Sequence, residues 1–203
     1  MLKIYKNTFD IDKLNKDLNT IISLCKFEDS SYGHSVPVMS KEMCPGSHIG
    51  FHNNWPFYHY SMDTIPYIYS IWKIFNEISD VCGFRIMRKL PNTAYGIHND
   101  TDAGNIIRMQ IPIQTNDGCW LAYTELSEIE ESWTNENTYF KSDLEKRFGD
   151  DVVFYQLTPG NLYYFNTNNI HTLTNEGDTI RYTLLIDLLK TNKAIQFIET
   201  NFN

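Results

Sequence analysis

The sequence has little of what marks an exported, disulfide-bonded or membrane protein. Its four cysteines are spread through 203 residues and form no Cys-x-x-Cys pair, which leaves neither a zinc pattern nor a disulfide framework. No stretch is long and apolar enough to span a bilayer. Residues 1–10 lack the apolar run of a signal peptide. We therefore expect reduced thiols, no membrane partner and a cytoplasmic protein.

Positive charge is also scarce. The chain carries 17 lysines and arginines against 25 acidic residues, a formal net charge of -8, and it contains no basic run. Such a surface repels phosphate backbones, which argues against a nucleic-acid partner. An acidic total is still compatible with a local basic pocket. We expect a partner of the size of a metabolite or a short peptide, and the sequence leaves the oligomeric state open.

The composition is that of an ordinary globular protein, with 42% hydrophobic and 21% charged residues. There is no internal repeat and no low-complexity linker. We expect a single domain over residues 1–203. Its predicted parts are a helical and loop-like N-terminal part at 1–83, a core at 84–189 interrupted by an insertion at 125–151, and a C-terminal helix or tail at 190–203.

Helices are predicted where apolar residues recur at steps of three and four. This spacing is found over residues 10–26 and 66–81, and Gly83 follows the second of these segments. A shorter helix is predicted around residues 142–148.

Two further segments carry no clear periodicity. Residues 27–63 are predicted to be loop-like and hold a cluster of aromatic residues and histidines that includes Trp55. This cluster either helps to bind a substrate or covers the open end of the core. The acidic segment 125–151 is either a lid over a pocket or a solvated surface insertion.

From Phe84 onward the apolar pattern shifts towards a period of two, which is typical of strands. Tight-turn residues such as Asp117-Gly118 and Pro159-Gly160 separate these segments. Short strands without intervening helices favour an antiparallel sandwich or barrel, so the fold class is mainly β with flanking helices. The predicted strands are 84–90, 94–98, 105–114, 118–123, 152–156, 161–166, 170–174 and 179–188.

Three residues in the predicted strands can bind a metal. His98 and Asp100 are two positions apart, so in extended backbone their side chains lie on the same face. His171 begins a later strand that can lie alongside. Two imidazoles and one carboxylate can occupy one face of an octahedral Fe(II) and leave the opposite face open, as in non-heme iron oxygenases.

A fixed cation follows at a suitable distance along the chain. A turn at residues 175–178 would bring Arg181 back beside the strand of His171, with its guanidinium pointing into the barrel. A guanidinium holds a planar carboxylate through two parallel hydrogen bonds. Thr183 shares the same face. This pair is a candidate for binding the far carboxylate of 2-oxoglutarate.

Arg108 and Gln110 form a second inward-facing pair on the strand after Asp100. Arg108 is a candidate for binding the metal-bound end of the co-substrate or a substrate carboxylate. Taken singly, each of these residues is more typical of a surface or loop position. Together, in this order and on predicted strands, they favour a shared site. The candidate substrate-binding residues are Trp120, Asn116, Gln110 and Trp55.

The segments 95–100, 107–116 and 159–171, followed by Asn175, Arg181 and residues 186–187, resemble the aspartyl/asparaginyl β-hydroxylase family. The resemblance covers roughly residues 84–189. It implies a double-stranded β-helix (a cupin-like jelly roll) that uses Fe(II), 2-oxoglutarate and O2. It also implies that the metal ligands are His98, Asp100 and His171, that Arg181 binds the distal carboxylate, and that Arg108 is a second basic residue near the co-substrate.

Because Asp100 is present, the chain is most similar to the family's cis-type free-proline hydroxylases. The expected function is hydroxylation of an unactivated C–H bond in an amino acid or a peptidyl side chain. Residues 1–83 and 125–151 match no pattern of the family, so the substrate and the site of oxidation stay open. The alternative is a non-catalytic cupin-like protein that binds a metal or a small ligand, although such a protein would not need Arg181 and Thr183.

Overall fold

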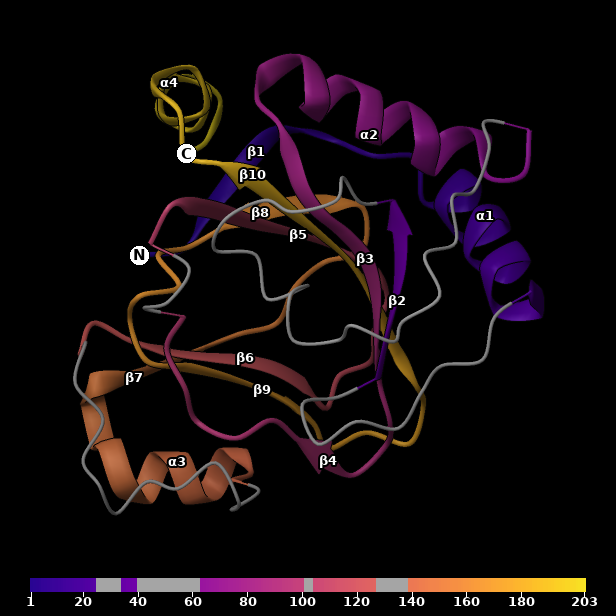
Figure 1. Cartoon of the computed structure of the whole chain (residues 1–203). Helices are drawn as coiled ribbons and strands as arrows, with labels where there is room; N and C mark the ends of the chain where they lie inside the picture. Colours follow the sequence, from indigo (N-terminus) through magenta and orange to yellow (C-terminus); the bar gives the residue numbers. More distant parts are fainter. Residues whose placement is uncertain (25–33, 40–62, 101–103, 127–138) are drawn as a thin grey trace.

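The computed structural model describes residues 1–24, 34–39, 63–100, 104–126 and 139–203. Two antiparallel sheets face each other (Figure 1), in the orders β1-β8-β5-β10-β3-β2 and β4-β9-β6-β7. This arrangement is the expected double-stranded β-helix. The strands are β1 (Lys3–Thr8), β2 (His34–Met39), β3 (Val81–Lys89), β4 (Thr93–Ala94), β5 (Ile106–Gln114), β6 (Cys119–Thr124), β7 (Val152–Tyr155), β8 (Asn161–Tyr164), β9 (His171–Asn175) and β10 (Arg181–Leu189).

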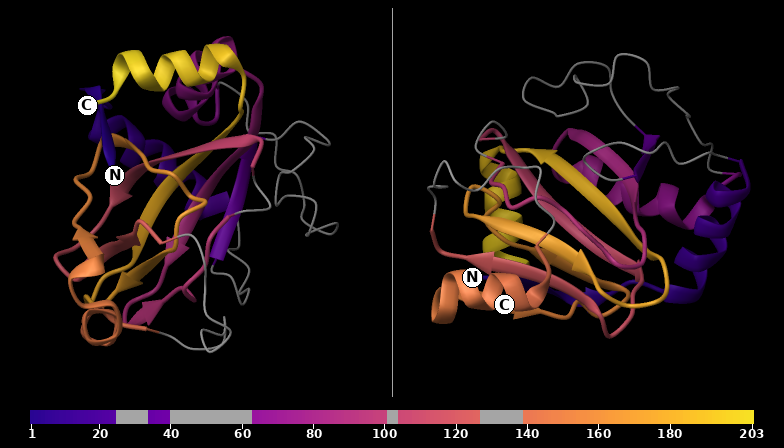
Figure 2. Two further views of the ribbon diagram at one scale, coloured as in Figure 1. Left: turned by 90° about the vertical axis from the view of Figure 1, so that its left-hand side faces the viewer. Right: turned by 90° about the horizontal axis from the view of Figure 1, so that it is seen from below.

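Helices cover the outer faces of both sheets. Three of them, α1 (Ile11–Leu24), α2 (Pro66–Ile78) and α4 (Asn192–Asn201), contribute to the core on the six-stranded sheet, whereas α3 (Lys141–Phe148) packs on the four-stranded sheet. The left view of Figure 2 places α4 and α3 at opposite ends of the molecule. Among the described helices, none is long and apolar enough to cross a membrane.

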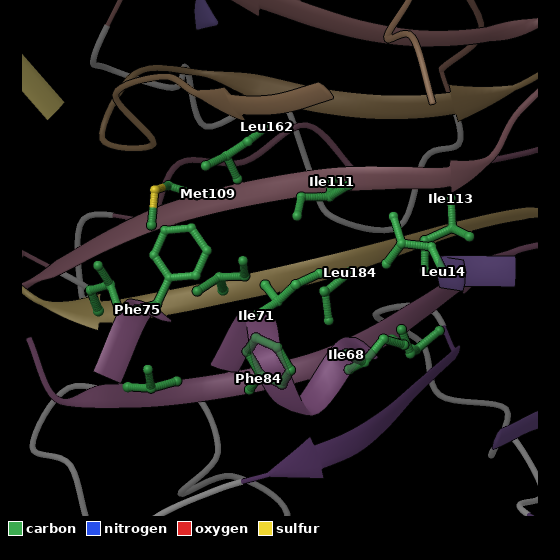
Figure 3. Close-up of a cluster of buried hydrophobic side chains, with 14 of the residues drawn as sticks. Leu14, Ile68, Ile71, Phe75, Phe84, Met109, Ile111, Ile113, Leu162 and Leu184 are labelled. Carbon is green, nitrogen blue, oxygen red and sulfur yellow. The ribbon is translucent and has the colours of Figure 1, made fainter. Parts of the chain in front are cut away.

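The six-stranded sheet separates an apolar face from a polar one. On β10, Tyr182, Leu184 and Ile186 belong to the main hydrophobic core under the helices, where Ile71 and Phe75 of α2 meet the sheet (Figure 3). Because side chains alternate along a strand, the residues between them face the other sheet. The interior between the two sheets therefore receives Arg181, Thr183 and Asp187.

A buried carboxylate joins the first two helices. Oδ2 of Asp17 in α1 accepts hydrogen bonds from the backbone N–H groups of Tyr67 and Ile68, each at 2.8 Å. These N–H groups lie in the first turn of α2, where the helix has no internal acceptors for them. Asp17 thereby fixes the start of α2 against α1.

The predicted helices and most predicted strands are confirmed, but the weak edges of the sheets are corrected. Residues 34–39, predicted to be loop-like, form β2 at one edge of the large sheet, and Lys3–Thr8 form β1 at the other. An edge strand needs only one hydrogen-bonded neighbour, so it tolerates Pro37 and a poor apolar pattern. The strand predicted at 94–98 shrinks to Thr93–Ala94, followed by an isolated bridge at His98.

Candidate metal centre

The structure brings His98, Asp100 and His171 together. His171 begins β9, and its backbone exchanges two hydrogen bonds with that of His98, with N–O distances of 3.1 and 2.8 Å. The Asp100 N–H donates to the Thr167 carbonyl at 2.7 Å. One ligand atom from each of the three side chains lies within 4.8 Å of the others. Backbone hydrogen bonds thus place the three residues beside one another, although His98 and Asp100 lie outside the named strands.

Both imidazoles are oriented with the same nitrogen available for a metal. Nδ1 of His98 is 2.8 Å from the Gly96 carbonyl oxygen, and Nδ1 of His171 is 2.9 Å from that of Asn169. A carbonyl only accepts, so each Nδ1 carries the proton and each Nε2 keeps its lone pair. The Nε2 atoms lie 4.0 and 3.8 Å from the carboxylate oxygens of Asp100. This donor set fits a divalent transition metal.

Aromatic side chains shield His171 from solvent. Its ring packs edge-on against Phe165 at 5.1 Å between centroids, and Phe165 packs in the same way against Tyr123 at 5.8 Å. Both aromatic residues belong to a buried cluster with Leu121 and Tyr163. Burial, followed by the neighbouring His98, lowers the pKa of His171 to about 3. The imidazole is therefore neutral, which is the form that binds metals.

Arg108 lies between two carboxylates. Its Nη1 donates to Asp100 at 2.6 Å, and its Nε donates to Asp187 at 2.7 Å. Arg85 of β3 adds a contact of 3.6 Å to Asp187. Burial opposes the charge on Asp187, but Arg108 and Arg85 outweigh it and lower the pKa of its carboxyl group. Arg108 is expected near the co-substrate. In the structure it forms an ion pair with Asp100, a candidate metal ligand.

The close approach of Asp187 requires a glycine on the adjacent strand. Gly83 pairs with Asp187 across β3 and β10, and a Cβ atom at Gly83 would lie 2.7 Å from Asp187 Oδ2. The sequence does not indicate this role, because a glycine after a helical pattern is typical of a helix end. The alternation of Phe84 and Ile86 with Arg85, by contrast, is a usable signal of an inward-facing arginine, to which the sequence-based prediction assigns no role.

Arg181 and Thr183 face the same interior, and the described part of the chain offers their polar side-chain atoms no partner. Arg181 is 2% exposed, and none of its three guanidinium nitrogens has a hydrogen-bond partner among the described residues. The Oγ1 of Thr183 and the hydroxyl of Tyr95 are likewise buried without a partner there. Burial lowers the pKa of Arg181 to about 10. A buried guanidinium without an acceptor is unfavourable, so this group fits an anion bound beside it.

The four candidate substrate-binding residues lie in different places. Gln110 is buried and shares the inner face of β5 with Arg108. Trp120 does not reach the site, because it packs on the outer face of the four-stranded sheet against Phe154 and Lys141. Asn116 is engaged in the turn after β5, where its amide donates to Asn175 and Thr179. Trp55 is outside the described residues.

Comparisons with known proteins identify the fold. No protein-family model matches the sequence, and no curated protein matches it. The structure is similar to the non-heme α-ketoglutarate-dependent carbocyclase SnoK from nogalamycin biosynthesis, with a TM-score of 0.56 and 11% identity over 93% of this chain and 79% of that one.

Two further solved structures show the same likeness. HygX from Streptomyces hygroscopicus, with nickel and 2-oxoglutarate bound, has a TM-score of 0.56 and 8% identity over 94% of this chain and 83% of its own. A prolyl hydroxylase from Trichoplax adhaerens, in complex with a hypoxia inducible factor peptide fragment, has a TM-score of 0.55 and 10% identity over 96% and 86%. The chain therefore has the double-stranded β-helix fold that these three proteins share.

Proposed function

We propose that this protein is an Fe(II)- and 2-oxoglutarate-dependent dioxygenase that hydroxylates an unactivated C–H bond. The observation that carries the proposal is Arg181, which has no hydrogen-bond partner among the described residues and is buried in the same interior that receives the two histidines and Asp100. A metal-binding protein without co-substrate chemistry has no use for a buried guanidinium there. An oxygenase needs it to hold the far carboxylate of 2-oxoglutarate.

The residues have distinct roles in this proposal. His98, Asp100 and His171 would hold the iron, which supplies the oxidising chemistry together with 2-oxoglutarate and O2. Arg181 and Thr183 would bind the distal carboxylate through charge-assisted hydrogen bonds. These side chains would fix the co-substrate in one orientation, and Phe165, packed edge-on against His171, would shield that metal ligand from solvent.

The charges of the interior suit a dianionic co-substrate. Among the residues that the structure describes, four basic side chains face it, against the two carboxylates of Asp100 and Asp187. This local excess is opposite in sign to the net charge of -8 for the whole chain. The basic side chains are Arg85, Lys89, Arg108 and Arg181.

For the substrate we propose an amino acid or a short peptide, and for the family the aspartyl/asparaginyl β-hydroxylases with their cis-type proline hydroxylases. Both rest on the motif resemblance at residues 84–189. Hydroxylation is the proposed outcome, although the fold also serves the carbocyclase SnoK and the epimerase SnoN. The presence of Asp100 supports hydroxylation, because it leaves no ligand position vacant for a halide.

The test is an anaerobic titration of the apoprotein with Fe(II) and then 2-oxoglutarate. A visible charge-transfer band of the chelate should appear in the wild type and in Trp120→Phe, whose ring lies on the outer face, and should be lost in His98→Ala. Succinate release with amino acids and peptides, and a product with one added oxygen atom, would then identify the substrate. Iron binding without the band would contradict the proposal and favour a cupin-like binding protein.

A further inference from the structure

A second buried cation lies directly opposite Arg181. Lys89, the last residue of β3, is the cross-strand partner of Arg181, the first residue of β10. Directly paired residues on antiparallel strands share a face, with Cβ atoms about 5 Å apart. Lys89 is 6% exposed, so both charges are held between the two sheets.

Neither cation is neutralised by the part of the protein that the structure describes. The Lys89 ammonium lies 3.8 Å from the centroid of the Tyr95 ring and forms no ion pair with a described carboxylate. The carboxylates of the interior are already engaged with Arg108 and Arg85. Like charges placed opposite each other on neighbouring strands are destabilising. This arrangement has an explanation if an anion binds between them.

The surrounding atoms are suited to such an anion. The hydroxyl groups of Tyr95 and Thr183 are buried and have no described hydrogen-bond partner. They can donate to the same acceptor as the two cations. Burial, and after it the charge of Arg181, lowers the pKa of Lys89 to about 7, and an anion bound between the two side chains would favour the charged form.

We propose that Lys89 and Tyr95 complete the anion site begun by Arg181 and Thr183, so that two cations on adjacent strands hold the far carboxylate of 2-oxoglutarate. This inference rests on the proposed function and adds the residues that set co-substrate specificity. A 2-oxo acid with an uncharged tail would leave both cations buried and unpaired. The site therefore selects a dicarboxylic co-substrate over a monocarboxylic one.

A purely structural role for Lys89 makes the opposite prediction about stability. If Lys89 serves the fold through its contact with Tyr95, Lys89→Met should lower the melting temperature of the apoprotein. If Lys89 serves an anion, removing an unpaired buried charge should leave that temperature unchanged or raise it. The defect of Lys89→Met should then be confined to ligand binding.

The experiment compares two ligands by calorimetry on the Mn(II)-loaded protein. One is 2-oxoglutarate, and the other is 2-oxopentanoate, which keeps the keto-acid end and lacks the far carboxylate. Lys89→Met should weaken 2-oxoglutarate binding at least about tenfold and leave 2-oxopentanoate binding unchanged, because one charge-assisted contact is lost. Lys89→Arg should retain most of the affinity. Tyr95→Phe should weaken 2-oxoglutarate alone, about threefold or more.

The control is Lys141→Met. Lys141 also lies over aromatic rings, those of Trp120 and Phe154, but on the outer face of the other sheet. The Lys141→Met protein should therefore bind both ligands as the wild type does. Unchanged 2-oxoglutarate binding in Lys89→Met would overturn the inference and leave the proposed function standing. Equal weakening of both ligands, with a lower melting temperature, would assign Lys89 to the fold. A wild-type protein that binds neither ligand would overturn the proposed function as well.

Discussion

Arg108 holds Asp187 through two nitrogens of one guanidinium, with Nε 2.7 Å from Oδ1 and Nη2 3.1 Å from Oδ2. The remaining terminal nitrogen reaches Asp100 at 2.6 Å. A fork with all three nitrogens engaged has one orientation. The backbone places Asp100, and Arg108, itself held by Asp187 of β10, orients its carboxylate.

Arg108→Lys should weaken metal binding. Lysine keeps the positive charge but cannot contact Asp187 and Asp100 in this geometry, so the Asp100 carboxylate loses its fixed orientation. Loss of such a supporting contact typically lowers metal affinity about 10–100-fold. Mn(II) binding to the apoprotein measures the effect, and the surface variant Arg147→Lys in α3 serves as control. An affinity equal to that of the wild type would show that Asp100 is positioned by the backbone alone.

Gly83→Ala should destabilise the protein. Its new methyl group would meet Asp187 Oδ2 at 2.7 Å, and Asp187 cannot retreat because Arg108 and Arg85 hold it. Overpacking at a buried site costs about 1–3 kcal/mol. Urea unfolding followed by circular dichroism measures this loss, and Mn(II) affinity should fall with it. A free energy of unfolding equal to that of the wild type would mean that the two strands can separate slightly without cost.

Asp17→Ala should loosen the start of α2. The variant leaves the N–H groups of Tyr67 and Ile68 without their acceptor, and loss of a capping oxygen costs about 1–2 kcal/mol. Asp17→Asn keeps an acceptor oxygen and should lose less. Chemical denaturation of the three proteins side by side tests this order. Equal stability of Asp17→Ala and the wild type would show that water replaces the carboxylate at little cost.

The part of the candidate site that depends on spacing along the sequence could be predicted. A barrel brings together residues at certain offsets along its strands. These offsets predict a shared site for His98, Asp100, His171 and Arg181. Contacts that depend on which strands become neighbours were not predictable in this way. Lys89 meets Arg181 only because β3 and β10 pair, although the two residues are far apart in the sequence.

Two further features could not be predicted from the sequence: which side of a strand faces the interior, and where the edge strands lie. A period of two predicts the strand that carries Trp120, but it does not say which side faces the interior. That choice depends on α3, which supplies Leu144 and Phe148 to cover the outer face. The edge strands β1 and β2 have one hydrogen-bonded neighbour each, so their residues are not selected for burial on both sides. Their weak patterns follow from that position.

The affinity for 2-oxoglutarate should fall as the pH rises above about 7. The pKa of Lys89 in the free protein is about 7, because of burial and then Arg181, so above this pH the amine is largely neutral. An anion bound beside it favours the charged form, and binding must therefore take up a proton. The expected limit is about a tenfold loss of affinity per pH unit.

The other groups around Lys89 let this effect be isolated. Burial lowers the pKa of Arg181 to about 10 and raises that of Tyr95 to about 12, so neither group titrates near pH 7, and Cys119 faces Arg181 from β6. Lys89→Arg stays charged across the range and should remove the pH dependence, which calorimetry in buffers of different ionisation enthalpy would show as loss of proton uptake. A slope that persists in Lys89→Arg would assign the proton to another group.

The stability of the apoprotein should change with pH in the opposite direction. Below about pH 7 the folded and unfolded states both carry a protonated Lys89. Between about 7 and the ordinary value of 10.5 only the unfolded state does, so it binds more protons and the free energy of unfolding rises with pH. Thermal unfolding of the wild type and of Lys89→Met between pH 7 and 9 separates this contribution, because only the wild type should gain it. Opposite slopes for ligand affinity and apoprotein stability, both lost on substitution of one lysine, distinguish an anion-binding lysine from one that only packs.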